Sequence, residues 1–182
     1  MSERAPHFYL GVHMPHWLAQ TDAPLFVSRR RLSGRKTLPQ AVGRWALDSG
    51  GFTELSLYGH WQTTEAEYVA DVRRFQNEIG GLEWVAPQDW MCEPFVLAKT
   101  GGSVAVHQEL TVENFLGLRE QLNSLVIPVL QGWTLADYHN CWALYEHHGV
   151  NLESEPIVGL GSVCRRQNTA EAGRIVRSGL RC

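Results

Sequence analysis

The sequence predicts an α/β fold on a parallel sheet, of the eight-stranded (β/α) TIM-barrel type. Three observations support this class. Six short apolar runs are spaced along the 182 residues, helical patterns or long polar loops separate them, and their polar residues gather at their carboxyl ends. Strands covered on both faces have this composition, and strands that alternate with helices form parallel sheets with right-handed crossovers.

The six runs are the expected strands, at residues 8–12, 25–28, 45–48, 84–87, 127–131 and 157–162. Residues 65–79 place their apolar side chains on one helical face. Further helices are expected at residues 112–125, with Thr111 as the N-cap, at residues 135–148 and at residues 170–176.

Six strand units fit two architectures, a doubly wound open sheet or most of an eight-stranded barrel. A complete barrel takes about 250 residues. The barrel interpretation therefore predicts one domain over residues 1–182 that is incomplete at its C-terminus, with about six βα units present.

Composition sets limits on the function. Hydrophobic residues are 44% and charged residues 19% of the chain, which is ordinary for a globular domain. The net charge of −3 provides no general attraction for a polyanion, so nucleic-acid binding would need a local basic patch. The four cysteines are scattered without a CxxC pair, which predicts neither a disulfide framework nor a metal site. No apolar run has the length of a membrane span or a secretory signal, and we expect a cytoplasmic protein.

The third expected strand ends in a candidate catalytic corner. Asp48 supplies a carboxylate there, and Ser49, Gly50, Gly51 and Phe52 follow it. Paired glycines let the backbone approach a ligand and offer N–H donors. The alternative is a tight turn in which Asp48 caps the next segment.

Three further strand ends carry polar groups. Asp89 could accept hydrogen bonds from the N–H groups of a ligand, although an aspartate in a turn can equally accept backbone bonds. Gln131, before Gly132, offers a donor and an acceptor that match an amide edge such as that of guanine, or it is an amide satisfied by nearby backbone.

The last strand contains Gly159, Leu160 and Gly161, which lack the spacing of a dinucleotide fingerprint and instead suggest backbone donors to a carbonyl oxygen. Because the carboxyl ends of parallel strands converge, the four strand ends predict one pocket.

One dense basic segment follows the second strand and contains Arg29, Arg30, Arg31, Arg35 and Lys36. Contact with nucleic-acid phosphates is one interpretation of this segment, and a solvated loop is the other.

The order and spacing of these motifs resemble the tRNA-guanine transglycosylase superfamily. DSGGF lies near the third strand, an aspartate follows the fourth, LQG is on the fifth and GLGS on the sixth. The segments FYLGVHMPHWL, SRRRL and VENFLGLRE resemble in particular the DpdA-like branch, which inserts 7-deazaguanine bases into DNA. The resemblance covers nearly the whole chain.

The resemblance implies a barrel that binds an extruded guanine nucleotide and replaces the base with a 7-deazaguanine such as preQ0. It implies an acid/base role for Asp48 and a stacking role for Phe52. Asp89 would recognise the exocyclic N–H groups of the base, Gln131 its polar edge, and the backbone of residues 159–162 its carbonyl. No cofactor is implied, since the zinc site of the tRNA enzymes has no counterpart in this sequence.

In the tRNA enzymes the nucleophilic aspartate lies on a later strand, and here no aspartate follows Asp137. Three explanations stay open: the chain is a piece of a longer enzyme, Asp48 carries more of the chemistry, or the chain is inactive alone. The alternative functions are therefore a tRNA-directed enzyme, or a non-catalytic base-binding or nucleic-acid-binding barrel fragment that needs a partner protein. An unrelated barrel glycosidase or phosphate-binding enzyme is a third class.

Overall fold

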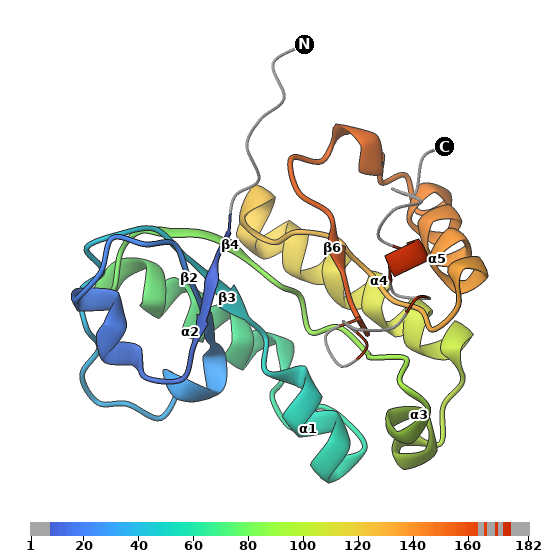
Figure 1. Ribbon diagram of the computed structural model, residues 1–182, viewed down its shortest axis with the longest axis horizontal. Helices are drawn as coiled ribbons and strands as arrows, with labels where there is room; N and C mark the ends of the chain where they lie inside the picture. The colour runs from blue at the N-terminus through green and yellow to red at the C-terminus, as the bar shows by residue number, and fades with distance from the viewer. Residues whose placement is uncertain (1–7, 164–165, 167–169, 171–172, 176–182) are drawn as a thin grey trace.

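The strands of the protein follow one another across the molecule in sequence order. The computed structural model describes residues 8–163, 166, 170 and 173–175. One parallel sheet contains β1 (Leu10–Val12), β2 (Leu25–Ser28), β3 (Trp45–Asp48) and β4 (Leu82–Val85), in that order. A second parallel pair contains β5 (Val129–Leu130) and β6 (Gly159–Leu160). A single parallel bridge between Val85 and Val126 connects the two sets. Figure 1 shows the two sets of strands side by side.

This arrangement confirms the prediction of an α/β fold with parallel strands. A doubly wound sheet has a switch point at which the strand order reverses. Within the described ranges each strand instead pairs with its neighbour in sequence, or reaches it through the Val85–Val126 bridge.

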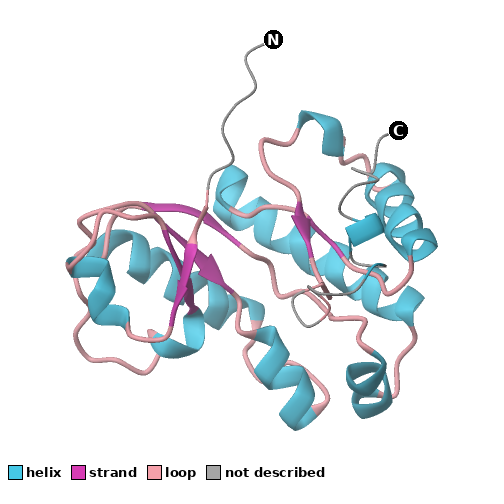
Figure 2. Ribbon diagram, in the orientation of Figure 1, coloured by secondary structure: helices cyan, strands magenta, loops and turns pink. Residues whose placement is uncertain are grey.

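Helices lie on the outside of the strands (Figure 2). The α-helices are α1 (Gly51–Tyr58), α2 (Glu65–Glu78), α3 (Pro94–Thr100), α4 (Val104–Leu122) and α5 (Leu135–His147). Short 3-10 turns are η1 (Pro15–Ala19), η2 (Arg29–Arg31), η3 (Asn123–Leu125) and η4 (Leu152–Ser154). Capping boxes at Thr64 and Thr134 satisfy the first N–H groups of α2 and α5 and set where these helices begin.

Side chains alternate between the two faces of the sheet. Trp45 and Leu47 are fully buried in the main core, which they share with Tyr68 and Phe75 of α2 and Phe115 of α4. Burial of such aromatic and aliphatic side chains contributes roughly 1.5–3 kcal/mol each.

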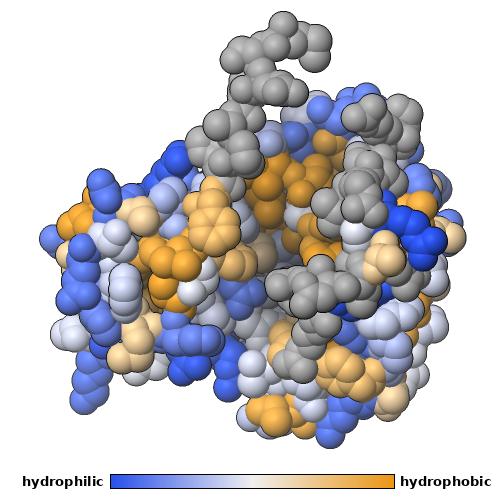
Figure 3. Space-filling view, viewed as in Figure 1, coloured by the Kyte–Doolittle hydropathy of each residue, from blue (hydrophilic) through white to orange (hydrophobic). Residues whose placement is uncertain are grey.

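The intervening residues of the sheet point to the opposite face. Phe26, Ala46 and Trp84 are register partners on adjacent strands, and Phe26 and Trp84 line a hollow on that side. Figure 3 shows apolar side chains gathered in the hollow between the two groups of strands. The face of the sheet with Phe26 and Trp84 therefore borders the hollow, whereas the opposite face packs against α2 and α4.

The sequence located the strands well and the helices less well. Residues 25–28 and 45–48 form strands as predicted, and the other four strands are shorter than expected or begin earlier. The helix expected at residues 112–125 begins at Val104, because Ser103 caps it by accepting the Val106 N–H. The prediction that Thr111 is its N-cap is wrong: Thr111 is buried inside α4 and its hydroxyl donates to the His107 carbonyl.

The helices at residues 65–79 and 135–148 are confirmed with slightly shorter bounds. Of the helix expected at residues 170–176, residues 170 and 173–175 are helical as predicted, and the other three lie outside the described residues. Helices α1 and α3 were not predicted. In the part of the chain that the structure describes, no helix has both the length and the apolar character needed to cross a bilayer.

Candidate active site

A cavity of about 340 Å³ opens at the carboxyl ends of the strands, and both groups of strands contribute to it. This volume falls at the lower end of the range for small-molecule sites, about 300–1,000 Å³. Its lining residues are Phe26, Asp48, Phe52, Trp84, Ala86, Asp89, Met91, Glu93, Ile127, Val129, Gly159, Leu160, Gly161 and Ser162. The walls are thus mainly apolar and aromatic, with three carboxyl groups among them.

Asp48 is the last residue of β3 and lies beside Ser28, its register partner at the end of β2. Burial raises the pKa of the Asp48 carboxyl, and hydrogen bonds from the Ser28 hydroxyl and the Gly50 backbone partly oppose the shift. A carboxyl group with a raised pKa holds its proton at higher pH than usual, as a general acid must.

The glycines after Asp48 have steric roles. Gly50 has a φ of 82° and is the N-cap of α1, a conformation that other residues rarely adopt. A Cβ on Gly51 would lie 2.5 Å from the Trp61 ring. These two glycines let α1 begin directly after β3, and they bring Phe52 to the cavity.

Asp89 follows β4 and is held by two side chains. Ser49 Oγ donates to its Oδ1 over 3.1 Å, and Gln131 Nε2 donates to its Oδ2 over 2.5 Å. Burial, followed by the charge of Asp48, raises the pKa of Asp89 to about 7, while the bonds from Ser49, its own backbone and Gln131 oppose the rise. Asp89 is therefore poised to change its charge near neutral pH.

Gln131 lies behind Asp89 rather than in the cavity wall, and its side chain is completely buried. The Gln131 Oε1 lies 2.8 Å from Ser162 Oγ, which is also 2.9 Å from Glu93 Oε2. Because a hydroxyl has a single proton, Ser162 donates to one of these oxygens at a time. A Cβ on Gly161 would lie only 2.2 Å from Gln131 Nε2, so a glycine is required there for Gln131 to reach Asp89.

Two of the backbone N–H groups in and after β6 are already hydrogen-bonded to β5 and the residue before it. The Gly159 N–H donates to the Pro128 carbonyl over 2.8 Å, and the Gly161 N–H donates to the Leu130 carbonyl over 2.9 Å. Since alternate residues of a parallel strand direct their amides to opposite sides, the Leu160 backbone faces away from β5. Leu160 is thus the residue of this segment whose N–H is directed away from the β5 ladder.

The predicted site residues fall into two groups. Six of them line the cavity: Asp48, Phe52, Asp89, Gly159, Leu160 and Gly161. The other five lie outside the lining: Ser49 and Gln131 hold Asp89, Gly50 and Gly51 form the turn after Asp48, and Gly132 packs closely against α5. Sequence reasoning missed seven lining residues: Phe26, Trp84, Ala86, Met91, Glu93, Ile127 and Val129. Strand alternation could have indicated Phe26 and Trp84, whereas no local signal indicated Met91 or Glu93.

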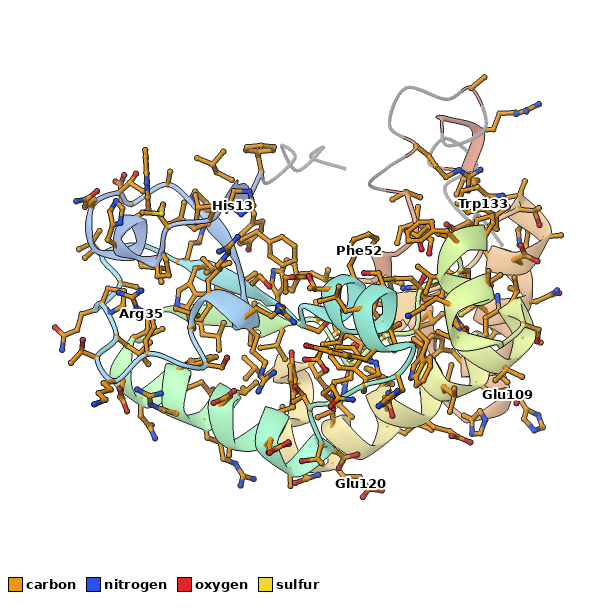
Figure 4. All side chains as sticks on the ribbon, turned by 90° about the horizontal axis from the view of Figure 1, so that it is seen from below. His13, Arg35, Phe52, Glu109, Glu120 and Trp133 are labelled. Carbon is orange, nitrogen blue, oxygen red and sulfur yellow. The ribbon has the colours of Figure 1, made fainter. Side chains whose placement is uncertain are left out.

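Phe52 extends from α1 toward the cavity, at the centre of the view in Figure 4. Its ring contacts Phe95 of α3 edge-on, with 5.8 Å between the ring centroids. Within the described residues, no group of three or more His, Cys, Asp or Glu side chains is arranged to hold a metal ion.

The basic segment does not act as one surface. The expectation that Arg29 contacts phosphate is wrong, because its guanidinium is buried and donates to Asp71 over 2.8 Å and to Thr63 over 2.6 Å. Glu54 of α1 lies 3.7 Å from the same group. The charge of Arg29 is therefore used within the fold, where it connects η2 to α1 and α2. The other four members, Arg30, Arg31, Arg35 and Lys36, are exposed.

Comparison with known proteins agrees with the resemblance seen in the sequence. A search of curated proteins found no match. The family model described as "DpdA: DeoxyPurine in DNA protein A" matches residues 4–180, nearly the whole chain. The chain therefore belongs to the DpdA family.

Proposed function

We propose that the protein is a pentosyltransferase that replaces guanine in DNA with a 7-deazaguanine base such as preQ0. The observation that carries this proposal is the pair Asp48 and Asp89 in one cavity whose walls are otherwise mainly apolar. Membership of the DpdA family supports a role in DNA modification and the choice of DNA as the substrate.

The cavity suits a purine base in shape and in chemistry. Chemistry on a base requires the base to leave the stack of the duplex, and the enzyme then reads the base edge and covers its face. Asp89 would accept the N–H groups of the guanine edge, and Phe52 would cover one face of the ring. Leu160 would offer its backbone to the remaining polar atoms. Ser49 and Gln131 orient the Asp89 carboxylate for this contact.

Asp48 would carry the proton during exchange. A nucleophilic carboxylate bonds to the sugar carbon as the bond from that carbon to N9 of guanine breaks, and Asp48 donates its proton to the departing base. N9 of the incoming 7-deazaguanine then bonds to the sugar carbon and displaces the carboxylate, while its N9 proton passes to Asp48, which restores the enzyme. Retention at the sugar carbon requires two displacements and thus a nucleophilic carboxylate as well. We propose no resident cofactor or metal for these steps.

The strand order supports an arc of a TIM barrel as the architecture of this site. In such barrels each strand pairs with the next in sequence, and the active site lies at the carboxyl ends of the strands. Strands β1 to β4 pair in this order, β5 pairs with β6, and Val85 of β4 bridges to Val126, which precedes β5. The cavity lies at their carboxyl ends.

Incubation of the protein with guanine-containing duplex DNA and radiolabelled preQ0 tests the proposal. We expect label in the DNA, none in tRNA offered in parallel, and release of one guanine per label incorporated. Asp48→Asn should abolish incorporation while the circular dichroism spectrum stays unchanged. The matched control is Glu109→Gln, an exposed carboxyl on α4 that points away from the cavity (Figure 4).

Each contrary outcome assigns a different function. Label in tRNA instead of DNA would make the protein a tRNA-directed enzyme. Binding of base and DNA without incorporation would make it a non-catalytic module that needs a partner protein. Unchanged turnover by Asp48→Asn would remove Asp48 from the mechanism.

A further inference from the structure

Two adjacent arginines at the end of β2 point in different directions. Arg29 is buried against Asp71 and Glu54, as described above. Arg30 is exposed and lies on the other side of η2, against the turn that follows Asp48. Their neighbour Ser28 hydrogen-bonds to the Asp48 carboxyl, so this end of β2 borders the catalytic corner directly.

The aliphatic part of Arg30 covers Gly50. A Cβ on Gly50 would lie 2.8 Å from Arg30 Cγ and 3.1 Å from Arg30 Cδ, and 3.2 Å from Ser28 Oγ. The side chain of Arg30 is therefore anchored along its stem, two residues from Asp48, while its guanidinium reaches the exposed surface. Packing of the stem limits the positions that the guanidinium can take and lowers the entropy that it loses on binding.

The carboxyl groups of the cavity would repel the phosphates of a bound DNA strand unless a nearby cation offset this repulsion. Asp48, Asp89 and Glu93 line the cavity, and the whole chain has a net charge of −3. A DNA strand that places a nucleotide there brings its own negative phosphates toward these carboxyl groups. Among the described residues, none of the ion pairs found involves Arg30.

We propose that Arg30 binds one of the two phosphates that flank the extruded nucleotide, and that Arg29 has no part in DNA contact. This inference rests on the proposed function. With the base against Asp89 and its glycosidic bond at Asp48, the sugar must lie at the mouth of the cavity. Its phosphates are then close to the turn that Arg30 covers. A guanidinium can bind a phosphate through two parallel hydrogen bonds, which fixes the position of the sugar as well as adding affinity.

The test compares Arg30→Gln with Arg35→Gln. Arg35 belongs to the same basic segment but lies near one end of the molecule, away from Phe52 at the centre of the view (Figure 4). We expect Arg30→Gln to raise the KM for DNA roughly ten-fold, as loss of a charged hydrogen bond does. It should also lower the slope of log affinity against log salt by about 1. The KM for preQ0 should not change, and Arg30→Lys should restore part of the affinity. Arg35→Gln should leave the KM for DNA within about two-fold, the size of effect expected for an isolated surface substitution.

Chemically modified DNA identifies the phosphate. A single neutral methylphosphonate is placed on the 5′ or on the 3′ side of the target guanine. At one of these positions it should weaken binding by wild-type protein as much as Arg30→Gln does, and it should weaken the variant no further. Additive losses at both positions, or equal binding by wild-type protein and Arg30→Gln, would overturn the assignment.

These measurements also separate this inference from the proposed function. Binding is followed by fluorescence anisotropy of labelled DNA, which requires no turnover. If preQ0 is never incorporated, the proposed reaction fails, but the anisotropy data still decide whether Arg30 contacts a phosphate. Equal thermal midpoints for the two variants would show that the fold is intact.

Discussion

Replacement of Asp89 by asparagine should make the free energy of unfolding much less dependent on pH. The pKa of Asp89 is about 7 in the folded protein and about 3.8 in a solvated chain. The folded state therefore binds a proton that the unfolded state releases between these values. Stability falls as pH rises from about 4 to about 7, because the raised pKa favours the folded state only while Asp89 is protonated.

The magnitude follows from the size of the shift. A difference of about 3 pKa units corresponds to about 4 kcal/mol at 1.36 kcal/mol per unit. This value is an upper bound, since Asp89 keeps some solvent exposure that screens its charge. Asparagine has nearly the same shape and no charge. At pH 8 we expect Asp89→Asn to be more stable than wild type by roughly 2–4 kcal/mol, and at pH 4 the difference should be small.

Urea denaturation followed by tryptophan fluorescence at pH 4, 5, 6, 7 and 8 measures this difference directly. Glu109→Gln is the control, because it also removes one carboxyl group but from an exposed site on α4. Equal pH slopes for wild type and Asp89→Asn would refute the assignment of a raised pKa to this residue. The same variant should lose affinity for the base above pH 7, where wild-type Asp89 is ionised and able to accept its N–H groups.

Three further predictions concern the support of the site. Arg29→Met should cost about 3–5 kcal/mol in urea denaturation, because it leaves Asp71 and Glu54 without their buried partner. Gly161→Ala should cost about 1–3 kcal/mol and weaken base binding measured by calorimetry, since its Cβ would displace Gln131 from Asp89. Phe75→Ala should lower stability by about 3–5 kcal/mol without altering the affinity for base, because Phe75 is fully buried on the side of α2 that faces the core.

The sequence predicts the strand ends because each is a local pattern. An apolar run that stops at Asp48, followed by glycines, needs no distant information to be recognised. The start of α4 depends instead on Ser103 and on the packing of a helix whose first turns are rich in valine, so periodicity alone placed it too late. Local patterns therefore located the corner of the site but not the helices around it.

The roles of individual side chains depended on contacts between distant residues. Arg29 and Arg30 are the same residue type at adjacent positions, yet one is paired with Asp71 and the other lies over Gly50. Gln131 had the chemistry of a base contact, but its side chain is held by Asp89 and Ser162, residues 42 and 31 positions away. The residues next to them in the sequence do not distinguish these roles.

The single bridge between β4 and Val126, just before β5, has a mechanical consequence. Val85 pairs with Val126 at only one point, and the Ile127 N–H donates to the Val85 carbonyl over 3.1 Å. Asp48 is on one side of this seam, whereas Gly161 and Leu160 are on the other. If the Val85–Val126 bridge opened, the cavity would widen while the strands on each side kept their own pairing. The Ile127 amide is thus a built-in reporter: its rate of hydrogen exchange would measure how often the two walls of the site move apart.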